Sequence, residues 1–499
     1  MKGTTTLSFT QTISRYKLIV SQMAMMGLIL MAFTLRIYHL GYQSLWRDEV
    51  DAIRFSDGSI IELVQAMTRV GHNGPLYYVM LRGWRALTGD SEFALRYLSL
   101  VGGVFMIAMT YRVCRRFTFD YMTAFLTTCL MTTSPYLIWY SQEAKMYTWL
   151  PSLVLVSVYA YKSALWENKT IKWWIIFVIA TSLSFYIHIL SPLMLGVYIV
   201  WAILQWEHVK PRLKGWMIAM GSLTLPYLPL VIWQGNTLLT TTDLGHQFYP
   251  FMEQMQLLTH FYSHGVIKSD YSIYFIIIAF TLIYFGFMAN FGGQDINGPV
   301  PTLRHRSYIL LWLVIPVFAI YIISLRIPIF EDRYLIYVVP SYYMLMALGL
   351  VALIKRFHWG MIIIFLIVIT NNIFEFDKQT HAILKADFRR VATYIAQASE
   401  PSPYIIFQMP YLEYTFRYYF PDSYHAIEGP WTNNDKPKED LAQEMTELTQ
   451  DVKIVWFVVS EETTWDERQL TRAWLNEHGI LLNENQFIGV EVYQYILGE

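Results

Sequence analysis

Cysteine and charged residues are both scarce in this chain. Its 499 residues include only two cysteines, Cys114 and Cys129, which excludes a disulfide framework or a thiolate metal cluster. Charged residues make up 15% of the sequence, well below the roughly 25% that is usual in soluble domains. Hydrophobic residues make up 55%. Such a chain cannot cover a water-facing surface, so a large soluble protein is excluded.

Apolar runs of about the length that crosses a bilayer, roughly 20 residues, recur along the chain. The first run follows Lys2, Arg15 and Lys17 and lacks a small-residue cleavage site, which indicates an uncleaved span and not a signal peptide. The composition and the runs together predict a polytopic α-helical membrane protein with about eleven spans. They are expected at residues 18–37, 94–112, 118–134, 146–164, 172–187, 189–206, 215–233, 272–291, 307–325, 334–354 and 359–374.

Basic residues cluster in alternate turns between these spans. With eleven spans, all these turns and the basic N-terminus fall on one side of the membrane, as the positive-inside rule requires of the cytoplasmic side. We therefore expect a cytoplasmic N-terminus and an extracytoplasmic C-terminus. The basic turns contain Arg112, Arg115, Arg116, Lys162, Lys169, Lys172, Lys210, Arg212, Lys214, Arg304, Arg306, Lys355 and Arg356.

The end of the chain differs from the rest in charge and pattern. Residues 371–499 hold 21 of the 38 acidic residues and 10 of the 37 basic ones, which makes nucleic acid an improbable partner. A helical pattern at 387–398 and β-rich runs at 404–409 and 453–459 predict a soluble α/β domain. No GxGxxG motif or P-loop occurs in it. We expect a membrane domain over residues 1–374 and an acidic extracytoplasmic domain over 375–499.

The long first outer loop, residues 38–93, belongs to the expected membrane domain. Its segments 60–70 and 76–87 have apolar residues at helical spacing and predict helices that lie in the membrane interface. Directly after the first span, the sequence SLWRDEV places Asp48 and Glu49 at the start of another helix. Acidic residues in a first turn can simply complement the helix dipole.

Four further segments at the outer ends of spans carry polar or charged side chains suited to a phosphate-containing substrate. Ordinary roles stay open for them: Lys145 and Arg333 as interfacial anchors, Glu143 as the ion-pair partner of Lys145, and the histidines as turn residues. The segments are GHNGPLYY with His72, SPYLIWYSQEAKMY with Glu143, Lys145 and Tyr147, SFYIHILSP with His188, and FEDRYLIYVVP with Arg333.

Taken in order, SLWRDEV, GPLYYVMLRGW, SEFALRYLS, SPYLIWYSQEAKMY and EDRYL resemble bacterial glycosyltransferase family 39 over residues 30–370. This protein O-mannosyltransferase-like group belongs to the GT-C membrane glycosyltransferases and includes the aminoarabinose transferases that modify lipid A. The resemblance implies transfer of a sugar from a polyprenyl phosphate carrier to an acceptor at the outer face of a bacterial cytoplasmic membrane. The acceptor, whether lipid, glycan or protein, is not identified by it.

The resemblance also implies roles for individual residues. Asp48 matches the acceptor-activating base, with Glu49 in support, and Lys145 and Arg333 match positions that hold the carrier phosphate. Relatives often have arginine in place of Lys145. His72 lies where relatives have a polar or acidic residue that is sometimes tied to a metal, so a divalent metal ion stays open as a cofactor.

The chemistry of such a transfer suits these residues. A lipid phosphate leaves readily once cations neutralise it, so the minimal site is one carboxylate base and about two basic groups. A nucleotide-sugar enzyme usually has a metal-binding Asp-x-Asp, which is absent from this chain. The alternative is a lipid or small-molecule transporter or flippase. Transporters usually place ionisable groups within spans and have internal repeats, and neither is visible here.

Overall fold

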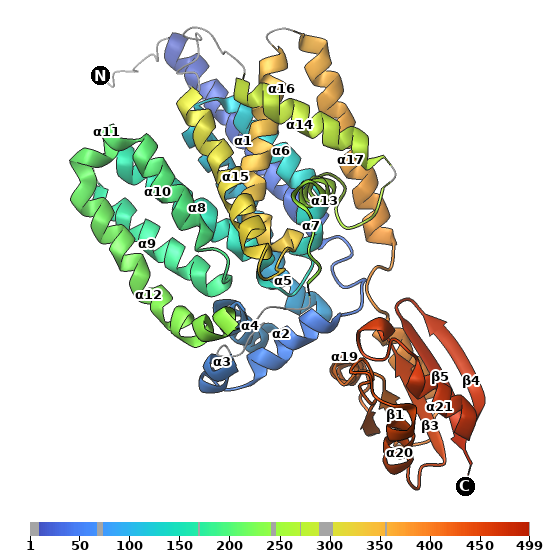
Figure 1. The fold of residues 1–499 in the computed structure, drawn as a ribbon. Helices are drawn as coiled ribbons and strands as arrows, with labels where there is room; N and C mark the ends of the chain where they lie inside the picture. Colours follow the sequence, from blue (N-terminus) through green and yellow to red (C-terminus); the bar gives the residue numbers. More distant parts are fainter. Residues whose placement is uncertain are drawn as a thin grey trace, which may run out of the picture. The chain divides into compact units, whose positions relative to one another are not determined.

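A computed structural model describes residues 9–66, 73–167, 170–240, 246–269, 271–288, 303–354 and 357–498. The contacts divide the chain into two compact units (Figure 1). The first unit contains residues 1–38, 58–90 and 94–379. The second contains residues 39–57, 91–93 and 380–499, and each unit is described separately below.

The first unit is built from helices. Short 3-10 helices adjoin three of them: η1 (Met146–Thr148), η2 (Lys210–Arg212) and η3 (Asp332–Val338). The α-helices are α1 (Phe9–Ile37), α3 (Ile60–Ala66), α4 (Pro75–Thr88), α5 (Glu92–Thr118), α6 (Tyr121–Thr133), α7 (Pro135–Ser141), α8 (Trp149–Trp166), α9 (Thr170–Ile187), α10 (Leu193–Leu204), α11 (Trp206–Val209), α12 (Leu213–Thr240), α13 (Phe251–His264), α14 (Ser272–Met288), α15 (Leu303–Ser324), α16 (Val339–Ile354) and α17 (His358–His381).

Each of the eleven expected spans corresponds to a helix, and the predicted fold class is confirmed. Among the residues that the structure describes, five helical segments are both long and apolar enough to cross a membrane: Val20–Ile37, Glu92–Thr118, Leu303–Ser324, Asp332–Ile354 and His358–His381. Shorter apolar helices cover Ile171–Ile187, Leu193–Leu204 and Ser272–Met288. The number of crossings therefore stays a prediction. Helices α3 and α4 confirm that the two segments of the first outer loop are helical, although residues 67–72 lie outside the described part of the chain. Their position in the membrane interface stays a prediction.

Helix α5 and the short helix η1 approach each other closely. A Cβ atom on Gly102 would lie 2.8 Å from the Thr148 Oγ1 atom, so only glycine permits this spacing. The Thr148 hydroxyl donates to the Ser99 carbonyl at 2.7 Å, and the Ser99 hydroxyl donates to the Lys145 carbonyl at 2.8 Å. These contacts fix the segment that carries Lys145 against α5.

The second unit contains a three-layer α/β domain. Its strands are β1 (Tyr404–Phe407), β2 (His425–Glu428), β3 (Ile454–Val459), β4 (Gly479–Phe487) and β5 (Val490–Leu497). They form one sheet in the order β2-β1-β3-β5-β4, in which β2, β1 and β3 are parallel and β5 and β4 are antiparallel to their neighbours. Its helices are α18 (Phe388–Ala398), α19 (Tyr411–Tyr419), α20 (Lys438–Leu448), η4 (Glu462–Thr464) and α21 (Leu470–His478).

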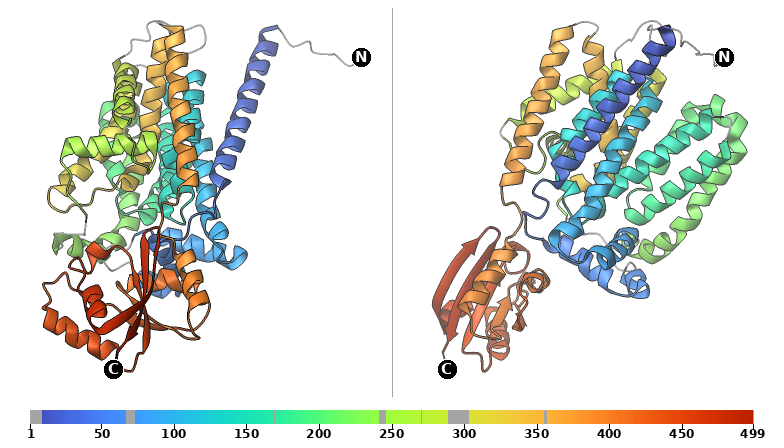
Figure 2. Two further views of the ribbon diagram at one scale, coloured as in Figure 1. Left: turned by 90° about the vertical axis from the view of Figure 1, so that its right-hand side faces the viewer. Right: turned by 180° about the vertical axis from the view of Figure 1, so that it is seen from behind.

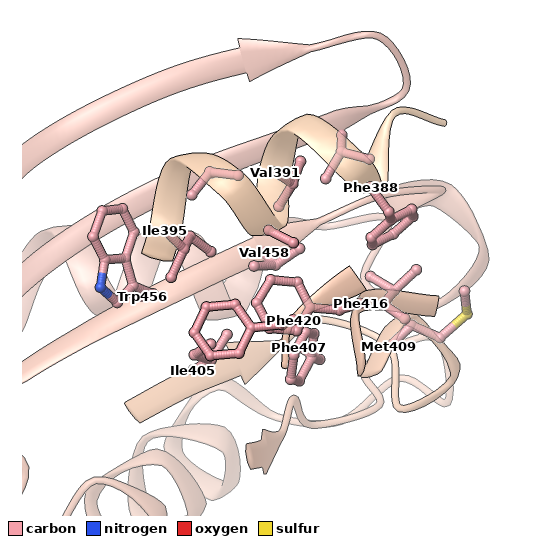
Figure 3. Packing of buried hydrophobic residues seen from close by; sticks show 14 residues of the cluster. Phe388, Val391, Ile395, Ile405, Phe407, Met409, Phe416, Phe420, Trp456 and Val458 are labelled. Atoms are coloured by element: carbon pink, nitrogen blue, oxygen red, sulfur yellow. The ribbon is translucent and has the colours of Figure 1, made fainter. Parts of the chain in front are cut away.

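Alternate side chains of the sheet point to opposite faces, as strand geometry requires. Ile405 and Phe407 pack with residues of α18 and α19, a cluster that Figure 3 shows from close by. Ile406 between them packs with residues of α20 and α21 on the other face. The expected helix at 387–398 and the expected strands at 404–409 and 453–459 are therefore confirmed.

Residues 39–57 fold with this domain and contain helix α2 (Arg47–Asp57). Two arginines of α2 lie over tyrosine rings of α19: Arg47 over Tyr411 at 4.4 Å and Arg54 over Tyr414 at 3.3 Å. The expected domain boundary assigned all of residues 38–93 to the membrane domain. The packing instead places Asp48 and Glu49 in the unit that contains the C-terminal sheet.

Candidate active site

Arg333 is positioned by a buried acidic neighbour. Asp332 begins η3, and its Oδ2 atom accepts a hydrogen bond of 2.9 Å from the Tyr140 hydroxyl. The Asp332 carbonyl accepts a second one, of 3.0 Å, from the Tyr136 hydroxyl. Burial raises the pKa of Tyr140 well above its usual range, so this hydroxyl stays protonated and keeps donating. Helix α7 thus fixes the backbone from which Arg333 extends.

Lys145 lies at the start of η1 and is buried, with 6% of its surface exposed. Its backbone N–H donates to the Glu143 carbonyl at 2.7 Å, which makes a tight turn between the two residues. Its ammonium group lies 5.9 Å from the centre of the Tyr78 ring. A lysine at this depth is held by its turn and its aromatic neighbour, and this differs from an anchor that reaches out to the membrane surface.

Arg333 also lies among aromatic rings. The guanidinium of Arg333 lies 5.8 Å from the Tyr147 ring centre and 5.9 Å from that of Tyr334. Tyr147 in turn packs edge-to-face on Tyr140, the residue that holds Asp332, with the ring centres 5.2 Å apart. Cations near aromatic faces are attracted to the rings. The cluster therefore suits a phosphate with an apolar tail.

His188 follows α9 and is fully buried beside this cluster. Its ring lies 5.0 Å from the Tyr334 ring, and burial together with the Arg333 cation lowers the pKa of His188 to about 3. The Nδ1 atom accepts a hydrogen bond of 3.2 Å from the Leu190 N–H. The neutral ring therefore carries its proton on Nε2, which is buried and has no hydrogen-bond acceptor among the described residues. It is a donor available to a substrate oxygen.

The structure thus brings five of the predicted site residues into the first unit: Glu143, Lys145, Tyr147, His188 and Arg333. His72 lies outside the described residues. Its neighbour Asn73 accepts a hydrogen bond of 3.1 Å from the Ile189 N–H through Oδ1. This bond ties the start of α4 to the turn that contains His188.

The acidic pair lies in the first turn of α2, in the second unit. Glu49 is fully buried, and its Oε2 atom lies 2.9 Å from the ammonium of Lys385. The same oxygen accepts from the Trp46 N–H at 3.5 Å, so Glu49 is the acid that reaches back to the helix start. Asp48 is half-buried. The two neighbouring acids therefore have different surroundings, with the second committed to a buried ion pair.

Three residues of these clusters were not predicted from the sequence. Lys385 has no motif around it and is separated from Glu49 by 336 positions. Asp332 and Tyr140 lie within the EDRYL and SPYLIWYSQEAKMY segments. The order of residues in these segments did not show that these two side chains would be buried.

A metal site was left open by the sequence. Within the described ranges, no three histidine, cysteine, aspartate or glutamate side chains gather closely enough to hold a metal ion. Glu49 is paired with Lys385, so Asp48 and Glu49 do not offer two uncommitted carboxylates to a metal ion.

Known proteins resemble this chain in one segment of sequence and in fold. Residues 72–233 match the family model described as dolichyl-phosphate-mannose-protein mannosyltransferase. No curated protein sequence gives a significant match.

Two solved structures share the fold. One is ArnT from Cupriavidus metallidurans bound to undecaprenyl phosphate, with a TM-score of 0.58, 12% identity, and coverage of 94% of this chain and 97% of that one. The other is the Archaeoglobus fulgidus oligosaccharyltransferase in complex with zinc and sulfate, with a TM-score of 0.52 and 14% identity. This second match covers 94% of this chain and 72% of that one.

The chain therefore has the fold of these membrane transferases, and residues 72–233 match the mannosyltransferase family model. The family match and the shared fold agree with the resemblance to the protein O-mannosyltransferase-like group seen in the sequence.

Proposed function

We propose that this protein transfers a sugar from a polyprenyl phosphate carrier to an acceptor at the outer face of a bacterial cytoplasmic membrane. The observation that carries the proposal is the cluster of Arg333, Lys145 and His188 among tyrosine rings in the membrane unit. Two cations and one neutral donor suit a phosphate that leaves with growing negative charge. The ArnT structure, with its bound undecaprenyl phosphate, supports a carrier of this kind.

The reaction breaks the bond between the anomeric carbon and the phosphate oxygen, and the electron pair stays on that oxygen. Arg333 and Lys145 neutralise the leaving phosphate. The acceptor hydroxyl oxygen forms the new bond to the anomeric carbon and gives its proton to a carboxylate base, the role that the family resemblance implies for Asp48. Glu49, held by Lys385, fixes the first turn of α2 from which Asp48 extends. Glu143 and Tyr147 are substrate-binding residues in this proposal, Tyr147 through the face of its ring.

Binding of the carrier tests the role of the cluster. We expect undecaprenyl phosphate to bind Arg333→Gln at least tenfold more weakly than the wild-type protein, because a charge-assisted contact is worth about 1.5 to 3 kcal/mol. Arg326→Gln is the matched control, since Arg326 is exposed and lies seven residues away in the same loop region. Equal affinity of Arg333→Gln and the control would contradict the assignment.

The products in cells test the transfer itself. A strain without this protein should accumulate the lipid-linked sugar donor and lose one sugar from an envelope glycan, lipid or protein, both measured by mass spectrometry. If the protein is instead a transporter or flippase, the purified protein will not transfer the sugar to any acceptor. Transfer by the purified protein in detergent, where no membrane separates two compartments, therefore distinguishes the two classes.

A further inference from the structure

A groove of about 790 Å³ lies in the membrane unit between α1, α5, α6 and α8. The left view of Figure 2 shows α1 diverging from the neighbouring helices toward its N-terminal end. One wall is apolar and comes from Met25, Met26, Ile29 and Leu30 of α1 and Ala108 of α5. It is separate in the chain from every residue of the candidate active site.

Three arginines line the groove at one end: Arg112, Arg115 and Arg116. Arg115 donates to the Phe119 carbonyl at 2.8 Å and lies over the Tyr121 ring, whereas Arg116 pairs with Glu167 at 2.8 Å. Arg112 is exposed, and no ion pair to it is found within the described ranges. No acidic side chain lines the groove, so its basic end has an excess of positive charge.

A buried lysine lies close to the basic end. The Lys162 ammonium lies 3.9 Å from the centre of the Phe117 ring and 5.3 Å from that of Phe119, which itself lines the groove. Its Nζ atom has no hydrogen-bond partner in the part of the chain that the structure describes. An unpaired cation at this depth is costly unless an anion is near. The positive-inside rule explains exposed arginines but not a buried lysine.

The length of the groove matches one leaflet. Its lining on α1 runs from Ser21 to Leu30, which is about 14 Å along a helix. Half of the hydrocarbon core of a bilayer is about 15 Å, from a full thickness of roughly 30 Å. The basic end lies where a headgroup would be, and the apolar wall extends along the path of an acyl chain. Basic pockets between membrane helices bind anionic headgroups in this way.

We propose that this groove binds an anionic glycerophospholipid, with its phosphate at Arg112 and Arg115 and one acyl chain along the wall of α1. The lipid fills the space between α1 and the bundle and provides the anion that the basic end lacks. This binding is independent of the proposed sugar transfer, because it uses none of the residues that hold the carrier.

Native mass spectrometry of the purified, delipidated protein in detergent tests the proposal. We expect phosphatidylglycerol to bind about tenfold to thirtyfold more tightly than phosphatidylcholine of the same chain length, a difference that two basic contacts provide. In Arg112→Gln/Arg115→Gln this preference should disappear. The control Lys210→Gln/Lys214→Gln removes two charges outside the groove and should keep it.

Two further experiments test whether the groove binds the acyl chain of the lipid. Ala108→Trp fills the groove without changing its charge and should weaken phosphatidylglycerol binding by a similar factor. Glycerol 3-phosphate, which has the phosphate but no acyl chain, should not compete. The proposal is overturned if the arginine variant keeps the preference, if the lysine control loses it equally, or if glycerol 3-phosphate competes as well as the lipid. Binding of undecaprenyl phosphate by each variant confirms that the variant is folded. If Ala108→Trp does not fold, the result for the arginine variant alone decides whether the proposal holds.

Discussion

The buried ion pair between Glu49 and Lys385 gives the sharpest test of how the acidic motif is held. Lys385→Met removes the ammonium but keeps a long apolar side chain of similar length. Glu49 is fully buried and Lys385 is 6% exposed, so water cannot replace the lost cation. Removing one partner of such a pair leaves an uncompensated buried charge, which costs about 3 to 5 kcal/mol.

This loss should be visible in the unfolding of the second unit. For a domain of roughly 150 residues, 1 kcal/mol shifts the Tm by about 2 to 4 °C, so Lys385→Met should lower the Tm by about 10 °C. The Tm is measured by thermal unfolding of the full-length protein in detergent, with limited proteolysis of the C-terminal unit as the readout. Lys453→Met is the matched control, because Lys453 is an exposed lysine of the same unit.

A double variant separates the ion pair from packing. Glu49→Leu/Lys385→Met removes both charges together, and such replacements are often neutral or stabilising. We therefore expect the double variant to unfold at a higher temperature than Lys385→Met alone. The reasoning is refuted if Lys385→Met melts within about 2 °C of the Lys453→Met control, or if the two single losses simply add in the double variant.

The other predictions concern catalysis, acid stability and topology. Asp48→Asn keeps the shape of the side chain but cannot accept a proton, so turnover should fall by about 10² to 10⁴ with carrier binding retained; turnover within a few-fold of wild type would show that Asp48 only caps its helix, and Glu49 would be the next candidate. The pKa of His188 is about 3 in the folded protein and about 6.5 in the unfolded chain, so the unfolded chain binds the proton first as the pH falls. The stability that the neutral ring contributes is therefore complete above pH 6.5 and is lost at lower pH. The Tm of His188→Gln should therefore fall less than that of the wild type between pH 7 and pH 5, and parallel decreases would contradict this. Reporter fusions after Arg116, Lys214 and Glu499 should report the cytoplasm for the first two and the outside for the last; a cytoplasmic signal at Glu499 would overturn the expected topology.

The elements that could be predicted from the sequence are those in which most side chains are buried in the membrane or in the protein core. Long apolar runs read directly as helices because bilayer and protein core exclude charge alike. Strands β1 and β3 lie in the middle of the sheet and are buried on both faces, so they read as continuous hydrophobic runs. Edge strand β2, with the sequence HAIE, and the exposed strand β4 lack such a run and were not predicted.

The site was predictable only in part for a similar reason. Lys145, Tyr147, His188 and Arg333 lie at or near the outer ends of expected spans, and a count of the spans places all these ends on one side of the membrane. The partner of Glu49 could not be predicted, because nothing local marks Lys385 among the lysines of the chain. The separation of the candidate residues into two units depends on the packing of α2 with α19, which no periodicity in the sequence encodes.

The folding of α2 with the C-terminal sheet has a consequence for biosynthesis. Glu49 leaves the ribosome 336 residues before Lys385 does, and at about 5 to 20 residues per second this interval lasts roughly 20 to 70 s. Throughout that time the acidic segment has no folded partner, although the first membrane helices are already made. The segment matures only when the last quarter of the chain arrives, so a ribosome that stalls or a message that ends early yields an inserted protein whose acidic motif never assembles.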